Sequence, residues 1–136
     1  MNSVGLVTMT ALLVIPASAA LLLMLLTGYR LGARLNVGAA LLSLLAAFTL
    51  FKARPDANAY LRVDDFNIYL IVLNNWVSFT TSLFSASYIA HELETGRLTP
   101  AYLRFYHATY QALIFAMNLA LLANNIGLLW VAIELA

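Results

Sequence analysis

Residues 4–26 read VGLVTMTALLVIPASAALLLMLL, and this stretch decides the fold class. It holds no charged side chain, and as a helix its 23 residues would reach about 35 Å, enough to cross a hydrocarbon layer of ~30 Å. We expect Pro16 to kink this helix without ending it, because a neighbouring helix can supply a donor to the carbonyl that proline frees. A signal peptide is the alternative, but no basic residue precedes the run and leucines continue past its small residues.

The composition of the whole chain also indicates lipid as the main solvent. Of the 136 residues, 63% are hydrophobic and 10% are charged, whereas a soluble domain carries ~25% charged residues. The mean hydropathy is +0.87 and the formal net charge is +1. So few charges exclude a soluble enzyme and a nucleic-acid-binding protein. The absence of cysteine excludes disulfides, thiolate metal sites and cysteine nucleophiles.

The pattern of apolar runs predicts an all-α, polytopic transmembrane helix bundle with four full spans and the first half of a fifth. The spans are expected at residues 4–26, 35–51, 66–89, 102–123 and 126–136. Polar segments between them predict loops, with residues 60–63 as a short extended piece and Asp64 and Asp65 capping the third span. The fifth run would rise only ~16 Å and leave carbonyls unpaired in lipid. We therefore expect the chain to continue beyond Ala136, or a partner to complete this helix.

The distribution of basic residues weakly favours an N-terminus outside the cell. With that orientation the cytoplasmic side holds four basic residues and the external loop holds three. Positive charge prefers the cytoplasmic side of a membrane protein. The four are Arg30, Arg34, Arg97 and Arg104, and the three are Lys52, Arg54 and Arg62.

Glu134 is the leading candidate for function because it is an acid inside an apolar run, WVAIELA at residues 130–136. If the helix enters the membrane near Asn124, the carboxylate lies ~15 Å deep, near the bilayer midplane. A charge there costs ~2.5–3.5 kcal/mol on insertion scales, so a protein keeps one that faces the bundle interior, a water-filled cavity or a basic partner. Proton carriage is the favoured interpretation. The alternatives are a structural carboxyl bonded to another helix and a run that does not cross the membrane.

Two further sets of polar residues lie within the expected spans. Asn74, Ser78, Ser82 and Ser85 follow steps of four, four and three residues, so they share one helix face. A helix-packing stripe is the favoured interpretation, and a water-lined path is the alternative. His107 lies near the start of the fourth span, where it could relay protons, although an interfacial or hydrogen-bonded histidine is the commoner case.

Other chemistry is not indicated by the sequence. The segment HELE at residues 91–94 reads as a solvated loop rather than a metal site, because one histidine and two glutamates lack a further ligand. No phosphate-binding loop and no metalloprotease motif is present. We expect no catalytic residue, cofactor or metal within the chain itself.

Several motifs together resemble the N-terminal part of the hydrogenase-4 component F subunits. These motifs are YIAHE at residues 88–92, then Gly96, Leu98 and Pro100, then Phe105 and Tyr106, and finally NNIGLLWVAIE at residues 124–134. That family belongs to the proton-translocating, antiporter-like membrane subunits of respiratory complex I, formate hydrogenlyase-type hydrogenases and Mrp antiporters. The resemblance covers roughly residues 63–136 and is most specific at residues 124–134.

The resemblance implies a site residue and a set of partners. Glu134 matches the channel carboxylate of the family, which pairs with a lysine two helices later. Lys52 is the sole lysine here and lies in a loop, so that partner lies outside this sequence. The implied function is redox-coupled proton translocation in an energy-converting hydrogenase or NADH-dehydrogenase-like complex, with the chain as one subunit of an oxidoreductase and no active site of its own.

The resemblance also implies where such a protein works. We expect a multi-pass protein of a bacterial or archaeal inner membrane, in contact with the lipid bilayer, other membrane-arm subunits and peripheral redox subunits. Iron–sulfur or nickel–iron centres are expected only in those partners. An Mrp-type cation/proton antiporter subunit and a non-catalytic structural or assembly subunit remain as alternatives.

Overall fold

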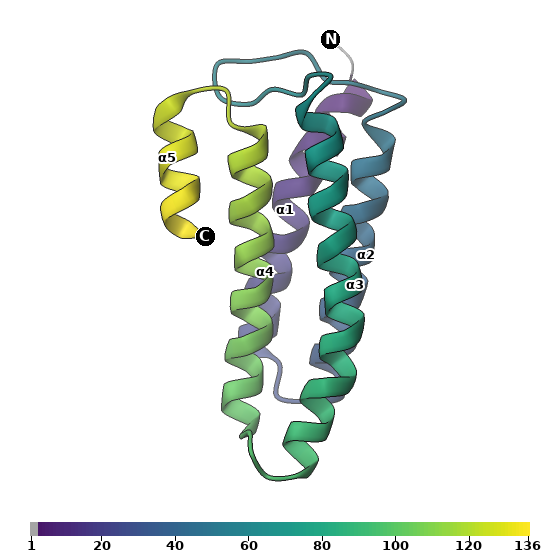
Figure 1. Cartoon of the computed structure of the whole chain (residues 1–136), viewed down its shortest axis with the longest axis vertical. Coiled ribbons are helices and arrows are strands. Elements are labelled where there is room, and N and C mark those ends of the chain that lie inside the picture. Colours follow the sequence, from purple (N-terminus) through teal and green to yellow (C-terminus); the bar gives the residue numbers. More distant parts are fainter. Residues whose placement is uncertain (1–2) are drawn as a thin grey trace.

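The computed structural model describes residues 3–136 and contains five α-helices within that range (Figure 1). They are α1 (Ser3–Leu25), α2 (Tyr29–Thr49), α3 (Asn67–Glu94), α4 (Pro100–Leu122) and α5 (Ile126–Leu135). The four long helices run side by side as a bundle, and the short α5 lies beside α4 (Figure 1). The all-α class and the five helical runs predicted from the sequence are confirmed.

Two helix boundaries differ from the prediction by more than two residues. α2 begins at Tyr29, six residues before the expected start, because the extended Gly28 is followed by residues that, apart from Gly32, have ordinary or high helix propensity. α3 continues to Glu94, so the segment expected as a solvated loop forms the last turn of a helix. α3 ends where Gly96 adopts a φ of 73°, a left-handed conformation that favours glycine. The boundary is therefore set by the glycine and not by the charges before it.

The long connection between α2 and α3 closes one end of the bundle. Leu61 forms an isolated antiparallel bridge with Ala123, which confirms the short extended piece predicted there. Asp64 caps α3, since its carboxylate accepts hydrogen bonds from the backbone N–H groups of Asn67 at 2.8 Å and Phe66 at 3.0 Å. These two bonds hold the pKa of Asp64 below its ordinary value. Asp65 does not cap the helix and instead pairs with Arg54.

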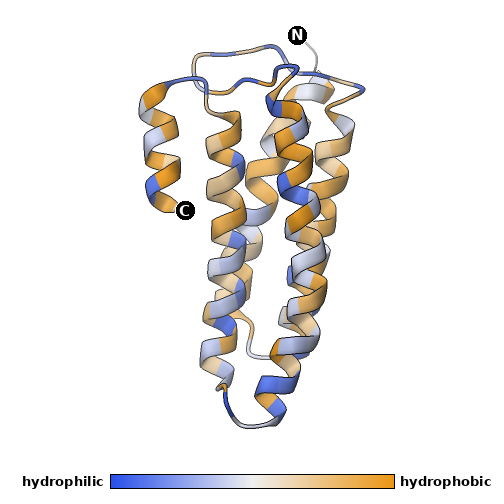
Figure 2. Cartoon of the chain, viewed as in Figure 1, coloured by the Kyte–Doolittle hydropathy of each residue, from blue (hydrophilic) through white to orange (hydrophobic). Residues whose placement is uncertain are grey.

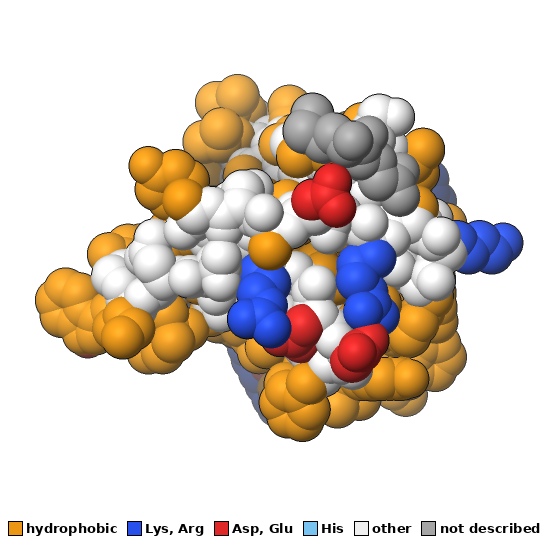
Figure 3. Space-filling view, turned by 90° about the horizontal axis from the view of Figure 1, so that it is seen from above, with side chains coloured by type: hydrophobic (Ala, Val, Ile, Leu, Met, Phe, Trp, Pro, Cys, Tyr) orange, Lys and Arg blue, Asp and Glu red, His pale blue; other side chains and the backbone are white. Residues whose placement is uncertain are grey.

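The bundle carries apolar side chains on its outside and many polar ones inside. Hydrophobic residues predominate along its helices, with hydrophilic residues interspersed among them (Figure 2). Large hydrophobic residues such as Leu25, Phe84 and Ile126 are 77%, 78% and 85% exposed. The connection between α2 and α3 includes residues 52–65, which we call the 52–65 loop. Seen from the end of the bundle that holds this loop, acidic and basic side chains lie together, with hydrophobic side chains around them (Figure 3). Within residues 3–136, ten polar side chains are buried instead: Thr8, Asn36, Ser43, Asn75, Ser78, Ser82, Ser85, His107, Gln111 and Asn118.

Two of the described helices, α1 and α2, are both long enough and apolar enough to cross a bilayer. α3 and α4 have the length but carry more polar residues, several of which are buried against other helices. An apolar cluster that includes Met9, Leu12, Leu50 and Ile71 fills the bundle near the 52–65 loop.

Candidate functional site

A proline inside α1 leaves one backbone carbonyl in the interior without its helical hydrogen bond. Pro16 has no backbone N–H, so the carbonyl of Leu12, one turn earlier, has no helical donor. The side-chain Nδ2 of Asn118 on α4 donates to that carbonyl at 3.0 Å. The prediction that a neighbouring helix would satisfy the carbonyl freed by Pro16 is thus confirmed, and α1 remains one helix from Ser3 to Leu25.

Asn118 also joins α3 to this point. Its Oδ1 accepts from Nδ2 of Asn75 at 2.9 Å and from Nδ2 of Asn74 at 3.1 Å, and its Nδ2 lies 3.3 Å from Oδ1 of Asn75. Asn75 and Asn118 have no exposed surface. We call Asn74, Asn75 and Asn118 the asparagine cluster. It ties α1, α3 and α4 together at one level of the bundle.

The predicted polar stripe of α3 lies against neighbouring helices. Ser78, Ser82 and Ser85 are buried, and Asn74 is partly buried. Two of the hydroxyls bond carbonyls of α3 itself, from Ser78 to Asn74 at 2.7 Å and from Ser82 to Phe79 at 2.6 Å. The third hydroxyl, of Ser85, lies 3.0 Å from the Tyr106 hydroxyl on α4. The described stripe therefore combines helix contacts with hydrogen bonds inside its own helix.

His107 lies on the face of α4 that meets α2. It is 2% exposed, and the ring of Tyr106 packs edge-on against it with centroids 5.4 Å apart. One turn along α4, Gln111 donates from Nε2 to Oδ1 of Asn36 at 2.7 Å and to the Asn36 carbonyl at 3.1 Å. A second polar contact thus joins α2 and α4, apart from the asparagine cluster.

Sequence reasoning did not single out Asn36 or the role of Gln111. The missed signal is that Asn36 and Ser43 lie seven residues apart within the expected span 35–51 and so share a helix face. Asn36 lies in the first turn of that expected span, where a polar side chain can reach water and needs no partner from another helix.

Glu134 is exposed on α5. Ala132 is the residue of α5 buried against the bundle. Among residues 3–136, the Glu134 carboxylate forms no ion pair and no hydrogen bond. No hydrogen bond or ion pair in the described residues joins Glu134 to His107 or to the α3 stripe.

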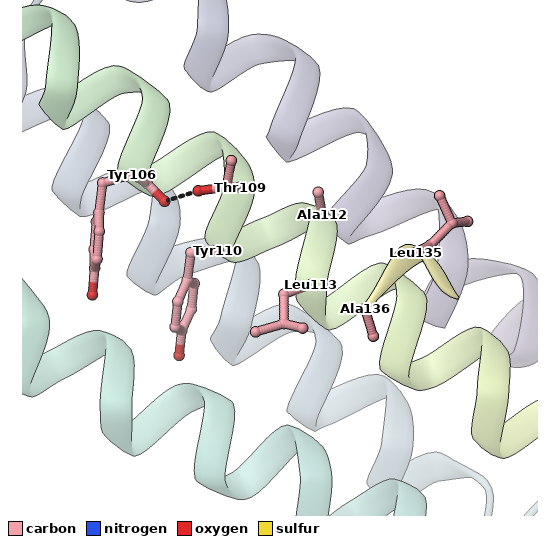
Figure 4. A pocket seen from close by; sticks show the side chains of 7 residues that line it. All are labelled: Tyr106, Thr109, Tyr110, Ala112, Leu113, Leu135 and Ala136. Carbon is pink, nitrogen blue, oxygen red and sulfur yellow. Dashed lines mark hydrogen bonds between the residues drawn. The ribbon is translucent and has the colours of Figure 1, made fainter. Parts of the chain in front are cut away.

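Two grooves lie beside the end of α5. One, of about 410 Å³, extends from Leu135 at the end of α5 along α4 to Tyr110 and Tyr106. The rings of these two tyrosines lie side by side (Figure 4). The other, of about 450 Å³, lies between α3, α4 and α5 and is lined mainly by apolar residues such as Val77 and Met117. Glu134 lines neither groove. Within residues 3–136, no group of three or more histidine, aspartate or glutamate side chains is placed to hold a metal ion.

The fold and its interior define an α-helical bundle with an apolar exterior and internal polar contacts between helices. In sequence, the chain is 50% identical over 127 residues to the Hydrogenase-4 component F homolog of Methylacidiphilum infernorum (isolate V4). The match covers 93% of this chain and 26% of that protein, so the chain spans about a quarter of its relative's length. No family model and no solved structure matches the chain.

The predicted resemblance to hydrogenase-4 component F is confirmed by this match. The similarity also reaches further than expected. The 127 matched residues exceed the segment 63–136 that carried the motifs, so they must include most of α1 and α2.

Proposed function

We propose that the chain is a membrane-embedded segment of a proton-translocating subunit in a hydrogenase- or NADH-dehydrogenase-like complex. The observation that carries this proposal is the 50% identity to a Hydrogenase-4 component F homolog over 93% of the chain. The partners would be other membrane subunits and peripheral redox subunits, which would hold the metal centres. Electron transfer would take place in those partners and ion movement in subunits of this kind.

The apolar exterior supports membrane embedding of all four long helices. α3 and α4 are less apolar than α1 because they carry Asn75, Gln111 and Asn118, and these side chains have no exposed surface. The outward side chains of the same helices, such as Phe84 and Phe105, are 78% and 60% exposed. Exposing such an apolar surface to water costs free energy, whereas exposing it to lipid does not. We therefore propose four full spans, α1 to α4, with α5 entering the membrane as a fifth.

Glu134 is the proposed proton carrier. Its neighbours Ile133 and Leu135 are 57% and 61% exposed, so lipid or further protein would cover this part of α5. A carboxylate in lipid is costly, which favours contact of Glu134 with further helices or internal water in the complete assembly. A carboxylate holds a proton when a neighbouring cation withdraws and releases it when the cation approaches. That property would couple proton movement to events in partner subunits.

The membrane topology can be tested with single cysteines, because the chain has no native cysteine. Ala57→Cys lies in the 52–65 loop and Thr95→Cys lies just after α3, at opposite ends of the bundle. A membrane-impermeant thiol reagent added to intact cells should label Ala57→Cys, and Thr95→Cys should react only after permeabilisation. Labelling of both cysteines from the same side would contradict the proposed spans.

Membership of a redox complex needs a separate test. An affinity tag on the protein that contains this chain should co-isolate iron-containing subunits from detergent-solubilised membranes. Isolation of the tagged protein without any redox subunit would refute this part of the proposal. The proton-carrying role of Glu134 is tested by proton translocation in the isolated complex.

A further inference from the structure

Polar atoms without a protein partner gather where α2 meets α4. Among the residues that the structure describes, Nδ2 of Asn36, Oε1 of Gln111 and both ring nitrogens of His107 are buried and form no hydrogen bond. These three side chains are 0%, 0% and 2% exposed. Buried polar atoms in folded proteins are almost always satisfied by protein or by ordered water. Four unsatisfied atoms in one region therefore indicate a small polar ligand.

Gly32 shows that there is room for such a ligand beside the imidazole. A methyl group added at Gly32 would lie 3.8 Å from Cδ2 of His107 and 3.8 Å from Cδ2 of Leu23, with no closer neighbour. Both distances are ordinary van der Waals contacts. A space of about methyl size thus lies between α1, α2 and α4. It borders the ring edge of His107, where Cδ2 is bonded to Nε2.

The chemistry of the unpaired atoms selects the ligand. A neutral imidazole offers one donor and one acceptor, Asn36 offers a donor and Gln111 offers an acceptor. An ion would need groups of one sign, whereas water both donates and accepts. Buried water typically forms about three hydrogen bonds to such groups. We propose that His107, Asn36 and Gln111, with the space at Gly32, form an internal water-binding site.

The site is separate from the asparagine cluster. On α4, Gln111 lies seven residues before Asn118, about 10 Å along the helix, and His107 lies eleven residues before it, about 16 Å. Bound water would give the otherwise enclosed His107 a partner for proton exchange inside the bundle. This site neither uses Glu134 nor depends on the function proposed for it.

The presence of water at His107 can be measured directly, because the chain has just two histidines. In a chain labelled with ¹⁵N-histidine and placed in lipid bilayers, water-edited solid-state NMR reports transfer of magnetisation from water to each ring. His91→Gln assigns the signals, and the exposed His91 serves as the hydrated reference. The proposal predicts rapid transfer to His107 despite its burial. A His107 ring that receives no transfer while His91 does would overturn it.

Two glycines of α2 provide a matched pair of variants. Gly32→Ala places a methyl in the proposed site, whereas Gly38→Ala adds the same methyl where nothing lies within 4 Å. Transfer to His107 should be lost in Gly32→Ala and retained in Gly38→Ala, with helical circular dichroism equal in both. Transfer that is unchanged in Gly32→Ala, or lost in both variants, would overturn the proposed location.

Discussion

Asn118→Leu tests whether the asparagine cluster holds the bundle together. The substitution removes hydrogen bonds to three partners: the Leu12 carbonyl on α1, and Asn75 and Asn74 on α3. Leucine has the same number and branching of side-chain heavy atoms as asparagine but carries no polar group. The variant therefore mainly removes polar contacts and leaves the Leu12 carbonyl and part of the Asn75 amide unpaired in the interior.

The expected loss follows from the bonds that disappear. Hydrogen bonds between membrane helices contribute about 0.6 kcal/mol each on average, and intramolecular bonds in soluble proteins contribute about 1 kcal/mol. The four contacts of Asn118 then predict a loss of roughly 2–4 kcal/mol in the free energy of unfolding. Reversible unfolding in mixed detergent micelles, followed by circular dichroism, measures this quantity.

Pro16→Ala turns the measurement into a double-mutant cycle. Alanine at position 16 restores a backbone N–H that can bond the Leu12 carbonyl. Asn118→Leu should therefore cost less in the Pro16→Ala background, by about one hydrogen bond, or ~0.6–1.5 kcal/mol. An Asn118→Leu variant with unchanged stability, or one whose cost is the same with and without Pro16, would contradict a role for Asn118 in satisfying the Leu12 carbonyl.

Three further predictions concern single contacts. Gly5→Ala would place its Cβ 2.6 Å from the backbone nitrogen of Pro55, so we expect a large loss of thermal stability. The control Gly38→Ala adds a methyl in open space and should stabilise the chain by about 0.5–1 kcal/mol. Equal melting temperatures for the two variants would contradict this prediction. The pKa of Asp64 is lower in the folded chain than its ordinary 3.8, so its cap stabilises fully above that value and is lost as the pH falls below it. An Asp64→Asn variant should therefore show a weaker fall of melting temperature at acid pH, and a fall equal to that of the parent chain would count against the cap. Ser85→Ala loses the bond to the α4 tyrosine hydroxyl and should cost about 0.6 kcal/mol in detergent unfolding, with no measurable cost as the contrary result.

Much of the fold could be predicted because its signals are local. The apolar runs gave the number of helices, and Pro16 indicated a carbonyl that another helix must satisfy. The start of α2 and the end of α3 could not be predicted from polarity alone. In a chain solvated by lipid, a polar residue can mark the end of a helix or a buried contact. Asn36 lies at the start of the expected second span, yet its side chain is buried.

The interior contacts could not be predicted because they join residues far apart in the sequence. Asn118 bonds Leu12 across 106 positions, and Gln111 bonds Asn36 across 75. Only the packing of the helices brings these residues together. Glu134 is the reverse case, since its position in an apolar run is a local signal. Its surroundings depend on whatever covers α5 in the complete assembly, so its role stays a prediction.

The most direct test of the proposed function is the number of protons translocated per electron pair by the complete complex in proteoliposomes. Glu134→Gln removes the proposed proton carrier while keeping the size of the side chain. Glu94→Gln, at the exposed end of α3, makes the same chemical change outside the proposed path. We predict that Glu134→Gln lowers the proton-to-electron ratio and that Glu94→Gln does not. An unchanged ratio in Glu134→Gln, with the complex intact, would contradict the account.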